Sequence, residues 1–573
     1  MKSLLKYLKN YKTESIVAPL FKMLEAIFDL IVPLVVADII DVGIKNGDTS
    51  YILGRCGILV LLAVVGMVIA ITAQYFAAKA ATGFGKELRH SVFEKVQSLS
   101  FSELDAVGTS RLITIISNDC TQVQTGVNIA LRLFLRSPFI IFGAMIMAFT
   151  VNTDAAVIFV VTIPILFAIV IGIMVYTIPK YRDVQNNLDN ITLKTRENLS
   201  GVRVIRAFTN EENEVNSFTK SNRALSHLQK AVGTISALTN PLTYVVVNIA
   251  IVALIYVGAI QVNTGNLTQG EVVALYNYMS QILVEIIKFV NMVVSFTKAI
   301  ACSSRIAKVL ELENTEEHND NCEIKTDNAV DFCNVSFKYK NASDESLSNI
   351  SFSARQGDII GVIGGTGSGK SSLVSLIPHF YDATSGEVLV DGRDVKSYEN
   401  SELQGKIGFV FQKAALFKGT VRDNLKWGNP NATDDEMNEA LNEAQILETV
   451  NEKGGLDAEI EQNGANLSGG QKQRLSVARA LVKKPQILVL DDSASALDFA
   501  TEAKLKQAIY DLPYNPTVFI VSQRASSVMN ANKIIVLDDG AVVGIGTHDE
   551  LLENCVVYRE IYDCQFGKEG SDE

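Results

Sequence analysis

The stretch DIIGVIGGTGSGKSSL (358–373) combines an apolar run, a glycine-rich turn and the first residues of a predicted helix. Its match to the pattern GxxxxGK[ST] uses Gly364, Gly369, Lys370 and Ser371. In this pattern, backbone N–H groups close around phosphate oxygens, the lysine reaches the outer phosphates and the hydroxyl suits Mg²⁺. Because a strand precedes the turn and a helix follows it, we predict a phosphate-binding loop rather than an ordinary glycine turn.

Further motifs lie in the same half of the chain. In NLSGGQKQRLSVARALVKKP (466–485), Ser468 and two glycines begin a predicted helix. A helix N-terminus offers free N–H groups to an anion, so this turn is a second candidate phosphate contact. The run ILVLDD (487–492) predicts a buried strand that ends in two acids, and GFVFQ (408–412) predicts a strand that ends just before Gln412.

The first half of the chain predicts a membrane domain. The 573 residues are 48% hydrophobic with a mean hydropathy of +0.21, and the long apolar runs all precede residue 300. A helix needs about 20 mostly apolar residues to cross the hydrocarbon core of a bilayer. The stretches that meet this requirement are 16–42, 53–78, 137–151 with its flanks, 155–178, 238–261 and 272–297.

The connections between these six spans alternate in charge. Residues 79–136 hold seven Lys or Arg and residues 179–237 hold nine, whereas the short connections hold one. Basic loops stay in the cytoplasm, so both termini are expected there. Each basic connection is too long for a structureless loop. We therefore predict two helical hairpins that extend the spans by roughly 40 Å, with turns near 103–110 and 207–214.

The expected organisation has five segments. They are an interfacial N-terminal helix (1–14), a transmembrane domain (15–305), a linker (306–328), a nucleotide-binding domain (329–566) and an acidic tail (567–573). The net charge of −12 argues against a nucleic-acid partner. Seven Cys without a CxxC pair indicate neither a disulfide framework nor a zinc site.

Charged residues also occur inside the predicted spans. Lys22, Glu25 and Asp29 lie in the first span, and Glu285 and Lys288 lie in the sixth. Charges within a membrane usually face a cavity or a partner, so they could line a polar translocation pathway. Alternatively they are structural ion pairs, since Lys22 and Glu25 are three residues apart on one helical face.

Taken together, the phosphate loop, LSGGQ and the LVLDD strand resemble the nucleotide-binding domain of an ABC transporter. Six spans with two long cytoplasmic hairpins resemble an ABC exporter half-transporter, and the resemblance covers essentially the whole chain. It implies a membrane α-helical bundle of six spans followed by an α/β P-loop nucleotide-binding domain. It also implies ATP and Mg²⁺ as cofactors, and a dimer in which each ATP lies between one chain's phosphate loop and the other chain's LSGGQ.

The resemblance also assigns site residues by position. ATP would contact Tyr339, which matches the adenine-stacking aromatic, and Gly364, Gly365, Thr366, Gly367, Ser368, Gly369, Lys370, Ser371, Ser372 and Gln412. Mg²⁺ would be held by Ser371, Gln412 and Asp491. The signature acting on the partner's ATP would be Ser468, Gly469, Gly470 and Gln471, and Asp498 would belong to the interface loop. Tyr339 could instead be a core aromatic of its strand.

Two catalytic positions depart from the family pattern. Asp492 stands where the family has a catalytic Glu, and Gln523 stands where it has a His. An Asp retracts the carboxylate by ~1.5 Å, and a misplacement of ~1 Å can cost ~10²-fold in rate. Gln can donate a hydrogen bond but cannot carry a proton or a positive charge. Ahead of the signature, Gln462 and Asn463 also replace the family's Glu and Arg.

These departures resemble the degenerate-site subunit of a heterodimeric bacterial multidrug ABC exporter. We therefore expect weak hydrolysis at this chain's own site, and an intact LSGGQ that completes the competent site of a second half-transporter. The expected cargo is a small amphipathic, drug-like molecule moved across the cell membrane. The alternatives are a homodimeric exporter of lipids or peptides, and a non-transporting ATP-gated regulator.

Overall fold

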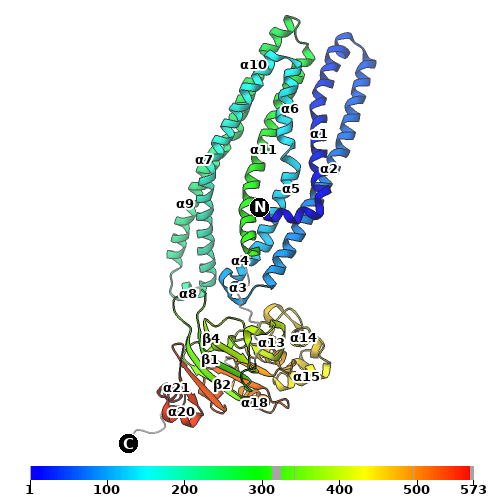
Figure 1. The fold of residues 1–573 in the computed structure, drawn as a ribbon. Helices are drawn as coiled ribbons and strands as arrows, with labels where there is room; N and C mark the ends of the chain where they lie inside the picture. Colours follow the sequence, from blue (N-terminus) through cyan, green and yellow to red (C-terminus); the bar gives the residue numbers. More distant parts are fainter. Residues whose placement is uncertain (1, 313–323, 341, 495, 568–573) are drawn as a thin grey trace. The chain divides into compact units, whose positions relative to one another are not determined.

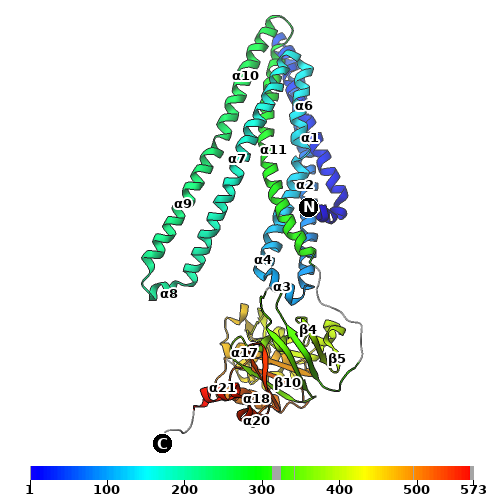
Figure 2. The same ribbon diagram turned by 60° about the vertical axis from the view of Figure 1, so that its left-hand side comes forward.

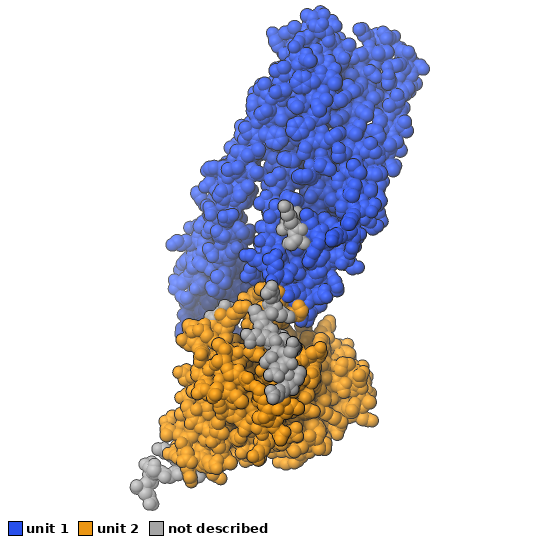
Figure 3. Space-filling view, viewed as in Figure 1, with its two compact units in different colours: residues 1–97, 110–311 blue, residues 98–109, 312–573 orange. Residues whose placement is uncertain are grey.

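The computed structural model describes residues 2–312, 324–340, 342–494 and 496–567. The described chain forms two compact units, coloured separately in Figure 3. One contains residues 1–97 and 110–311, and the other contains residues 98–109 and 312–573. The short segment 98–109, at the predicted first hairpin turn, thus belongs to the unit formed by the C-terminal half.

The first unit is entirely helical, as predicted, and Figures 1 and 2 show its long rods. A 3-10 helix, Lys2–Tyr11, comes first. The rods are α1 (Lys12–Asp38), α2 (Thr49–Gln97), α5 (Cys120–Leu133), α6 (Arg136–Val151), α7 (Thr153–Ser200), α9 (Glu211–Ala237), α10 (Thr239–Asn263) and α11 (Gln269–Leu310). Short helices α4 (Thr109–Thr114) and α8 (Val202–Ala207) and two π-helical stretches, Ile39–Ile44 and Ile115–Asp119, connect them.

Within the described residues, five helical stretches are long and apolar enough to cross a membrane. They are Thr49–Gln97, Thr109–Val151, Thr153–Ser200, Glu211–Asn263 and Gln269–Leu310. The remaining predicted span, α1, has 27 residues and carries Lys22, Glu25 and Asp29 among its apolar residues. The unit therefore has five or six spans, depending on whether this charged helix is counted.

The two predicted hairpins extend well beyond a membrane thickness. Helix α2 has 49 residues and α7 has 48, so at 1.5 Å per residue each is about 70 Å long. The first turn contains Gly108 with φ +80°, a conformation that glycine adopts without strain. At the second turn Phe208 is 79% exposed.

Three predicted boundaries need correction or fall outside the described residues. The linker does not begin at residue 306, because α11 continues to Leu310 and buries Ile306 and Val309. The interfacial helix does not reach residue 14, because a 3-10 helix over Lys2–Tyr11 gives way to α1 at Lys12. Most of the predicted linker (313–323) and of the acidic tail (568–573) lies outside the described residues.

The second unit is built on a six-stranded sheet with the order β12-β11-β3-β10-β9-β6. The four central pairings, β11–β3, β3–β10, β10–β9 and β9–β6, are parallel, and β12 is antiparallel to β11. The strands are β3 (Ile359–Gly364), β6 (Ile407–Val410), β9 (Ile487–Asp491), β10 (Thr517–Ser522), β11 (Lys533–Asp538) and β12 (Ala541–Gly546). A separate antiparallel sheet has the order β2-β1-β4-β5, with β1 (Val330–Phe337), β2 (Leu347–Ala354), β4 (Ser385–Val390) and β5 (Arg393–Asp394).

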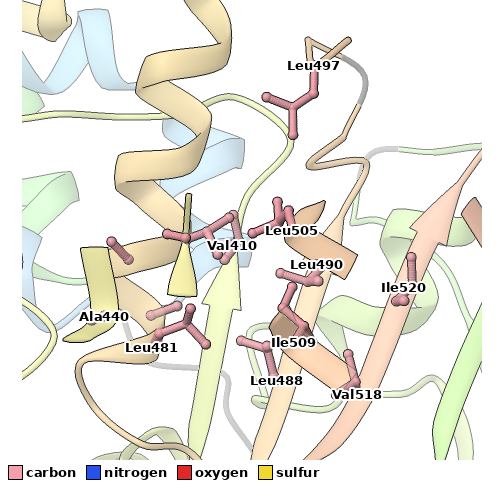
Figure 4. Packing of buried hydrophobic residues seen from close by; sticks show 14 of the residues in the cluster. Val410, Ala440, Leu481, Leu488, Leu490, Leu497, Leu505, Ile509, Val518 and Ile520 are labelled. Carbon is pink, nitrogen blue, oxygen red and sulfur yellow. The ribbon is translucent and has the colours of Figure 1, made fainter. Parts of the chain in front are cut away.

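Both faces of the central sheet are buried. Alternate residues of a strand point to opposite faces, and on β10 Val518 and Ile520 pack into one hydrophobic cluster while Phe519 and Val521 pack into the other. Figure 4 shows the first cluster, where residues of β6, β9 and β10 meet Leu481 of α17 (Gly469–Leu481) and Leu505 of α18 (Phe499–Tyr510). The second cluster joins the central sheet to the antiparallel sheet and to α12 (Lys370–Ser375). Burial on both sides is typical of parallel strands and explains their unbroken apolar runs.

The remaining α-helices and strands of this unit are short. They are α3 (Phe101–Val107), α13 (Asn400–Lys406), β7 (Gly419–Thr420), α14 (Val421–Lys426), α15 (Asp434–Glu443), α16 (Leu447–Glu452), β8 (Glu459–Ile460), α19 (Ala525–Val528), α20 (His548–Asn554) and α21 (Val556–Phe566).

We expect Phe519→Ala to lower the free energy of unfolding of this unit by about 3–5 kcal/mol, because the ring is fully buried in the central strand. Trp427 is the only tryptophan of the chain and lies in this unit, so its fluorescence during denaturant unfolding of the full-length chain reports on the unit. Val543→Ala, at a side chain that is 43% exposed, is the control and should cost less than about 0.5 kcal/mol. Equal effects of the two changes would contradict the assignment of β10 to the core.

Candidate functional site

Neighbouring parallel strands deliver the predicted site residues to one edge of the central sheet. The strand β3 ends at Gly364 and leads into the glycine-rich loop, while β10 leads into Gln523. Next in the sheet, β9 leads into Asp492, and β6 leads through one residue to Gln412. Parallel strands all finish at the same edge, and ligands of open α/β sheets bind outside that edge. The topology therefore brings together residues that are up to 159 positions apart in the sequence.

A cavity of about 720 Å³ lies along this edge. Most of the predicted nucleotide-binding residues line it, together with both departures from the family pattern. The lining includes Tyr339, Thr366, Gly367, Gly369, Lys370, Ser371, Ser372, Gln412, Asp491, Asp492 and Gln523. It also includes residues that the sequence did not single out: Ala342, Ser343, Asp344, Glu345, Ser346, Val521, Asp539 and Gly540. Among the predicted ATP contacts, Gly364, Gly365 and Ser368 belong to the same loop but not to the cavity wall.

The glycine-rich loop depends on backbone conformations that suit glycine. Gly367 has φ +85° and Gly369 has φ +94°. A Cβ on Gly369 would lie 2.6 Å from the carbonyl oxygen of Ser346, so the loop has no room for a side chain there. By contrast, Gly365 has open space where a Cβ would stand. The surrounding protein atoms therefore exclude a side chain at position 369 but not at position 365.

Lys370 is buried beneath the loop that precedes it. Its Nζ donates hydrogen bonds to the carbonyl oxygens of Gly364 at 2.9 Å and Gly365 at 2.6 Å. Burial lowers the pKa of Lys370, and the nearby carboxylates of Asp492 and Asp491 oppose this effect. The lysine therefore holds a cationic group at the inner end of the loop, where a phosphate chain would lie.

The oxygen donors expected for Mg²⁺ are adjacent. The hydroxyl of Ser371, in the first turn of α12, donates a hydrogen bond of 2.9 Å to Oδ1 of Asp491 at the end of β9. Burial raises the pKa of Asp491, and this hydrogen bond opposes the rise. Gln412 lines the same cavity. Hydroxyl, carboxylate and amide oxygens are hard donors of the kind that Mg²⁺ takes alongside phosphate oxygens and water, so the set fits this ion.

Tyr339 follows β1 and lies both against core aromatic rings and at the cavity wall. Its ring packs edge-on against Phe337 and Tyr381, with centroids 4.7 and 5.3 Å away, so it contributes to the core. It also lines the cavity, and its hydroxyl lies 3.0 Å from Oγ of Ser372. A base could therefore contact a ring that is already fixed by its neighbours.

The two departures from the family pattern lie on adjacent strands at the cavity wall. Oδ2 of Asp492 accepts a hydrogen bond of 3.3 Å from Nε2 of Gln412, and Asp492 has φ +45°. Burial raises the pKa of Asp492, and the hydrogen bond from Gln412 opposes this rise. The Oε1 of Gln523 accepts a hydrogen bond of 3.4 Å from the hydroxyl of Thr366, in the glycine-rich loop. Both side chains are thus connected to groups that surround the same cavity.

The signature residues do not line this cavity. Ser468 caps α17 in a reciprocal capping box, in which its side chain accepts from the backbone of Gln471 and the side chain of Gln471 accepts from the backbone of Ser468. Gly469 and Gly470 form the first turn of that helix, as predicted. Asp498 caps α18 by accepting from the backbone of Thr501 at 3.1 Å. These residues therefore lie outside the cavity that contains the phosphate loop.

Contacts that the sequence did not specify connect the first hairpin turn to residues that follow β1 and α12. Glu103 of α3 is buried and pairs with Lys340, with 2.8 Å between Oε1 and Nζ. Tyr381 donates a hydrogen bond of 2.6 Å to Asp105, and the ring of Phe101 lies 4.4 Å from that of Phe380. The sequence predicted the position of this turn, but no sequence pattern pairs an acid at 103 with a lysine at 340.

Comparisons with known proteins agree with this architecture. The model of the ABC transporter transmembrane region matches residues 15–286, and the ABC transporter model matches residues 347–495. An uncharacterized ABC transporter ATP-binding protein of Bacillus subtilis (strain 168), YfiB, is 36% identical over 573 residues, which cover 100% of both chains. The putative multidrug export ATP-binding/permease protein YgaD of the same organism is 30% identical over 580 residues, which cover 99% of each.

Among solved structures, a bacterial Atm1-family ABC exporter with ATP bound superposes with a TM-score of 0.81 and covers 98% of this chain and 99% of its own. At 21% identity, this similarity describes the fold. A helical transmembrane unit followed by a mixed-sheet unit with a phosphate loop is the arrangement of a half-transporter. The chain therefore belongs to the ABC transporter family, as a membrane half-transporter with the exporter fold and an ATP-binding domain that drives transport.

Proposed function

We propose that this chain is the degenerate-site half of a heterodimeric exporter of amphipathic, drug-like molecules. One observation carries the proposal: Asp492 and Gln523 line the same cavity as Lys370 and Ser371. The binding half of the site is complete, whereas the groups expected to activate water are shortened or uncharged. Two changes in one cavity are explained by one relaxed requirement for hydrolysis.

In this proposal, some residues of the site bind the nucleotide and others take part in its hydrolysis. The loop amides and Lys370 would bind the phosphates, Tyr339 would contact the base, and Ser371, Asp491 and Gln412 would hold Mg²⁺. When bound, Mg²⁺ would supply positive charge against the phosphates. Asp492 lies at the water-activating position but reaches less far than Glu, and Gln523 can only donate a hydrogen bond to the terminal phosphate. This cavity therefore retains nucleotide and hydrolyses it slowly.

The competent site is assembled with a second half-transporter that carries Glu and His at the two positions. This chain would supply Ser468, Gly469, Gly470 and Gln471 to that site, and Asp498 would lie at the interface. Both termini are cytoplasmic, because the basic connections mark the inner side of the membrane. The name of YgaD supports a drug-like cargo. A homodimer would instead transport when this chain is purified alone.

We expect Gly369→Ala to weaken binding of a fluorescent ATP analogue to the full-length chain by at least about tenfold, because the new Cβ meets the Ser346 carbonyl and the residue must keep a positive φ. Gly405→Ala is the control, since Gly405 is exposed on α13 outside the cavity and a Cβ there meets open space. It should leave binding within about twofold of wild type. Equal losses in the two variants would mean that the loop does not hold the nucleotide as proposed.

We expect Asp492→Glu alone to leave single-turnover hydrolysis at this chain's site slow, because Gln523 still cannot carry a positive charge beside the phosphate. The double variant Asp492→Glu, Gln523→His should hydrolyse on the order of 10²-fold faster than either single variant. The measurement is single-turnover hydrolysis in the purified heterodimer, with the partner's site blocked. Full recovery from Asp492→Glu alone would reject a multiply degenerate site.

Gly469→Asp should abolish steady-state ATPase activity of the heterodimer, because it places a carboxylate and added bulk against the phosphates held by the partner. Gly405→Asp is the matched control, since Gly405 is exposed on α13 and a Cβ there meets open space. It should change turnover by less than about twofold. Asp492→Asn should also leave turnover within about twofold if the partner's site performs most of the hydrolysis. Turnover that survives Gly469→Asp would place the competent site elsewhere.

A further inference from the structure

The charged residues of the first unit form one connected network across three helices. Arg136, at the start of α6, lies at its centre: NH2 is 2.9 Å from Oδ2 of Asp29 on α1, and NH1 is 2.9 Å from Oε1 of Glu285 on α11. Lys288 pairs with the same oxygen of Glu285 at 2.9 Å. The other oxygen of Glu285 accepts a hydrogen bond of 2.8 Å from the hydroxyl of Ser137. The network thus joins all three helices through ion pairs.

A second ion pair extends the network along α1. Lys22 and Glu25 lie 2.5 Å apart, and Oε1 of Glu25 is 3.7 Å from Arg136. These side chains are 10% and 17% exposed, so this end of the network is enclosed. The whole network contains three cations and three carboxylates, so it has no net charge. For Lys22 and Glu25 the structural interpretation of the intramembrane charges is sufficient.

The opposite end of the network opens into a cavity of about 520 Å³ between α1, α6 and α11. One face of each helix contributes to its wall: Asp29, Val32, Pro33 and Val36 from α1, Arg136 and Ile140 from α6, and Asn277, Ser280, Gln281, Val284, Glu285 and Lys288 from α11. The wall therefore combines charges with branched aliphatic side chains. Such a surface suits a ligand that is apolar in its body and charged at its ends.

Two of the lining charges differ from the enclosed members of the network. The side chains of Asp29 and Lys288 are each 43% exposed, whereas those of Arg136 and Glu285 are 12% and 5% exposed. Arg136 and Glu285 already form ion pairs with neighbouring side chains. Asp29 and Lys288 each retain hydrogen-bonding capacity toward the cavity, since only Oδ2 of Asp29 and one contact of Lys288 are engaged among the described residues. The cavity thus offers one accessible anion and one accessible cation.

Gln281 adds an unsatisfied polar atom to this wall. Its Nε2 donates to the backbone oxygen of Asp29 at 3.2 Å, while its buried Oε1 has no hydrogen-bond partner in the described part of the chain. A buried acceptor without a partner costs about 1–3 kcal/mol. The terminal torsion of a Gln side chain rotates broadly, so a donor that enters beside Asp29 can reach this oxygen. The unsatisfied acceptor lies at the anionic end of the cavity, where a ligand's N–H group would be bound.

From this arrangement we infer that the cavity binds an amphipathic zwitterion, with its ammonium group at Asp29 and Gln281 and its acidic group at Lys288. This inference rests on the proposed export function and specifies the substrate class. A zwitterion keeps the site neutral, and neutrality matters because an uncompensated charge inside a membrane is costly. Hydrogen bonds of 2.9 Å through Arg136 and Glu285 connect the two charges, so they lie no more than about 11 Å apart, given the fixed width of a guanidinium group.

A short apolar peptide has this chemistry and supplies a matched set of probes. An extended tripeptide spans at most about 11 Å. The tripeptide Phe-Leu-Phe with free ends would be compared with its N-acetylated, C-amidated and doubly blocked forms, which share the same apolar body. Binding to the full-length transporter would be measured in nanodiscs of phosphatidylglycerol, which contain no zwitterionic lipid. We expect the free-ended peptide to bind on the order of tenfold more tightly than either singly blocked form.

Substitutions at the two ends should remove separate parts of this preference. Asp29→Asn should bind the free and N-acetylated peptides equally, and Lys288→Gln should bind the free and amidated peptides equally. Asp29→Glu, which keeps the charge, should restore at least part of the discrimination, so a folding defect is distinguishable from loss of the site. Lys22→Gln and Glu25→Gln are the matched controls, because they remove the same kinds of charge from the network outside the cavity and should leave the preference unchanged.

The zwitterion could also come from a lipid headgroup, and a second arm distinguishes this source. Phosphatidylethanolamine added to the nanodiscs would compete with the free-ended peptide in the wild-type protein, but not in Asp29→Asn, if the site accepts a headgroup. Lack of competition would assign the site to soluble zwitterions. Equal affinity for all four peptides, no binding of the free-ended form, or discrimination that survives in both variants would overturn the inference. If one of these results were obtained and the transporter still exported a neutral dye, the zwitterion inference would fail and the proposed export function would stand.

Discussion

The nucleotide cavity depends on one constraint, the shared direction of β3, β10, β9 and β6. Parallel strands present their carboxyl ends at a single edge, and each of the four leads into a residue of the cavity within two positions. The order of the strands in the sheet therefore sets the order in which these residues lie along the edge. The phosphate loop lies at one side, Gln523 and the two acids lie next, and Gln412 lies beyond them. A change of register in any one strand would remove its residue from the site.

This constraint also explains why residues of separate sequence motifs line one cavity. The glycine pattern around Lys370 and the apolar run before Asp491 each specify local structure, and the rules for parallel sheets bring them together. The capped helix at Ser468 was equally predictable, because the capping box is a local motif. The hairpins followed from length and charge, although the structure extends α11 to Leu310, beyond the predicted start of the linker. That end is set by burial of Ile306 and Val309, which the residue pattern near a domain boundary does not reveal.

The charged network of the first unit contains ion pairs that could not be predicted from the sequence. Spacing along one helix identified the pair of Lys22 and Glu25. It could not identify Arg136 as the common partner of Asp29 and Glu285, because these residues are separated by 107 and 149 positions and no local rule pairs them. The same limit applies to Glu103 and Lys340, which are 237 positions apart. Long-range ion pairs between helices depend on helix packing, and packing is determined by many side chains at once.

Adjacent residues connect nucleotide binding to the first hairpin. Tyr339 lines the cavity, and the next residue, Lys340, pairs with buried Glu103 in α3. Tyr381 likewise packs against Tyr339 and donates a hydrogen bond to Asp105 of the same helix. A base that immobilises Tyr339 therefore restrains the backbone that carries Lys340, and a ligand can shift an equilibrium only by such differential contacts. In the proposed heterodimer, a slowly hydrolysed nucleotide would maintain this restraint over many cycles of the partner's site. The short reach of Asp492 would then have a mechanical consequence: one half remains closed on its hairpin turn while the other half opens and resets.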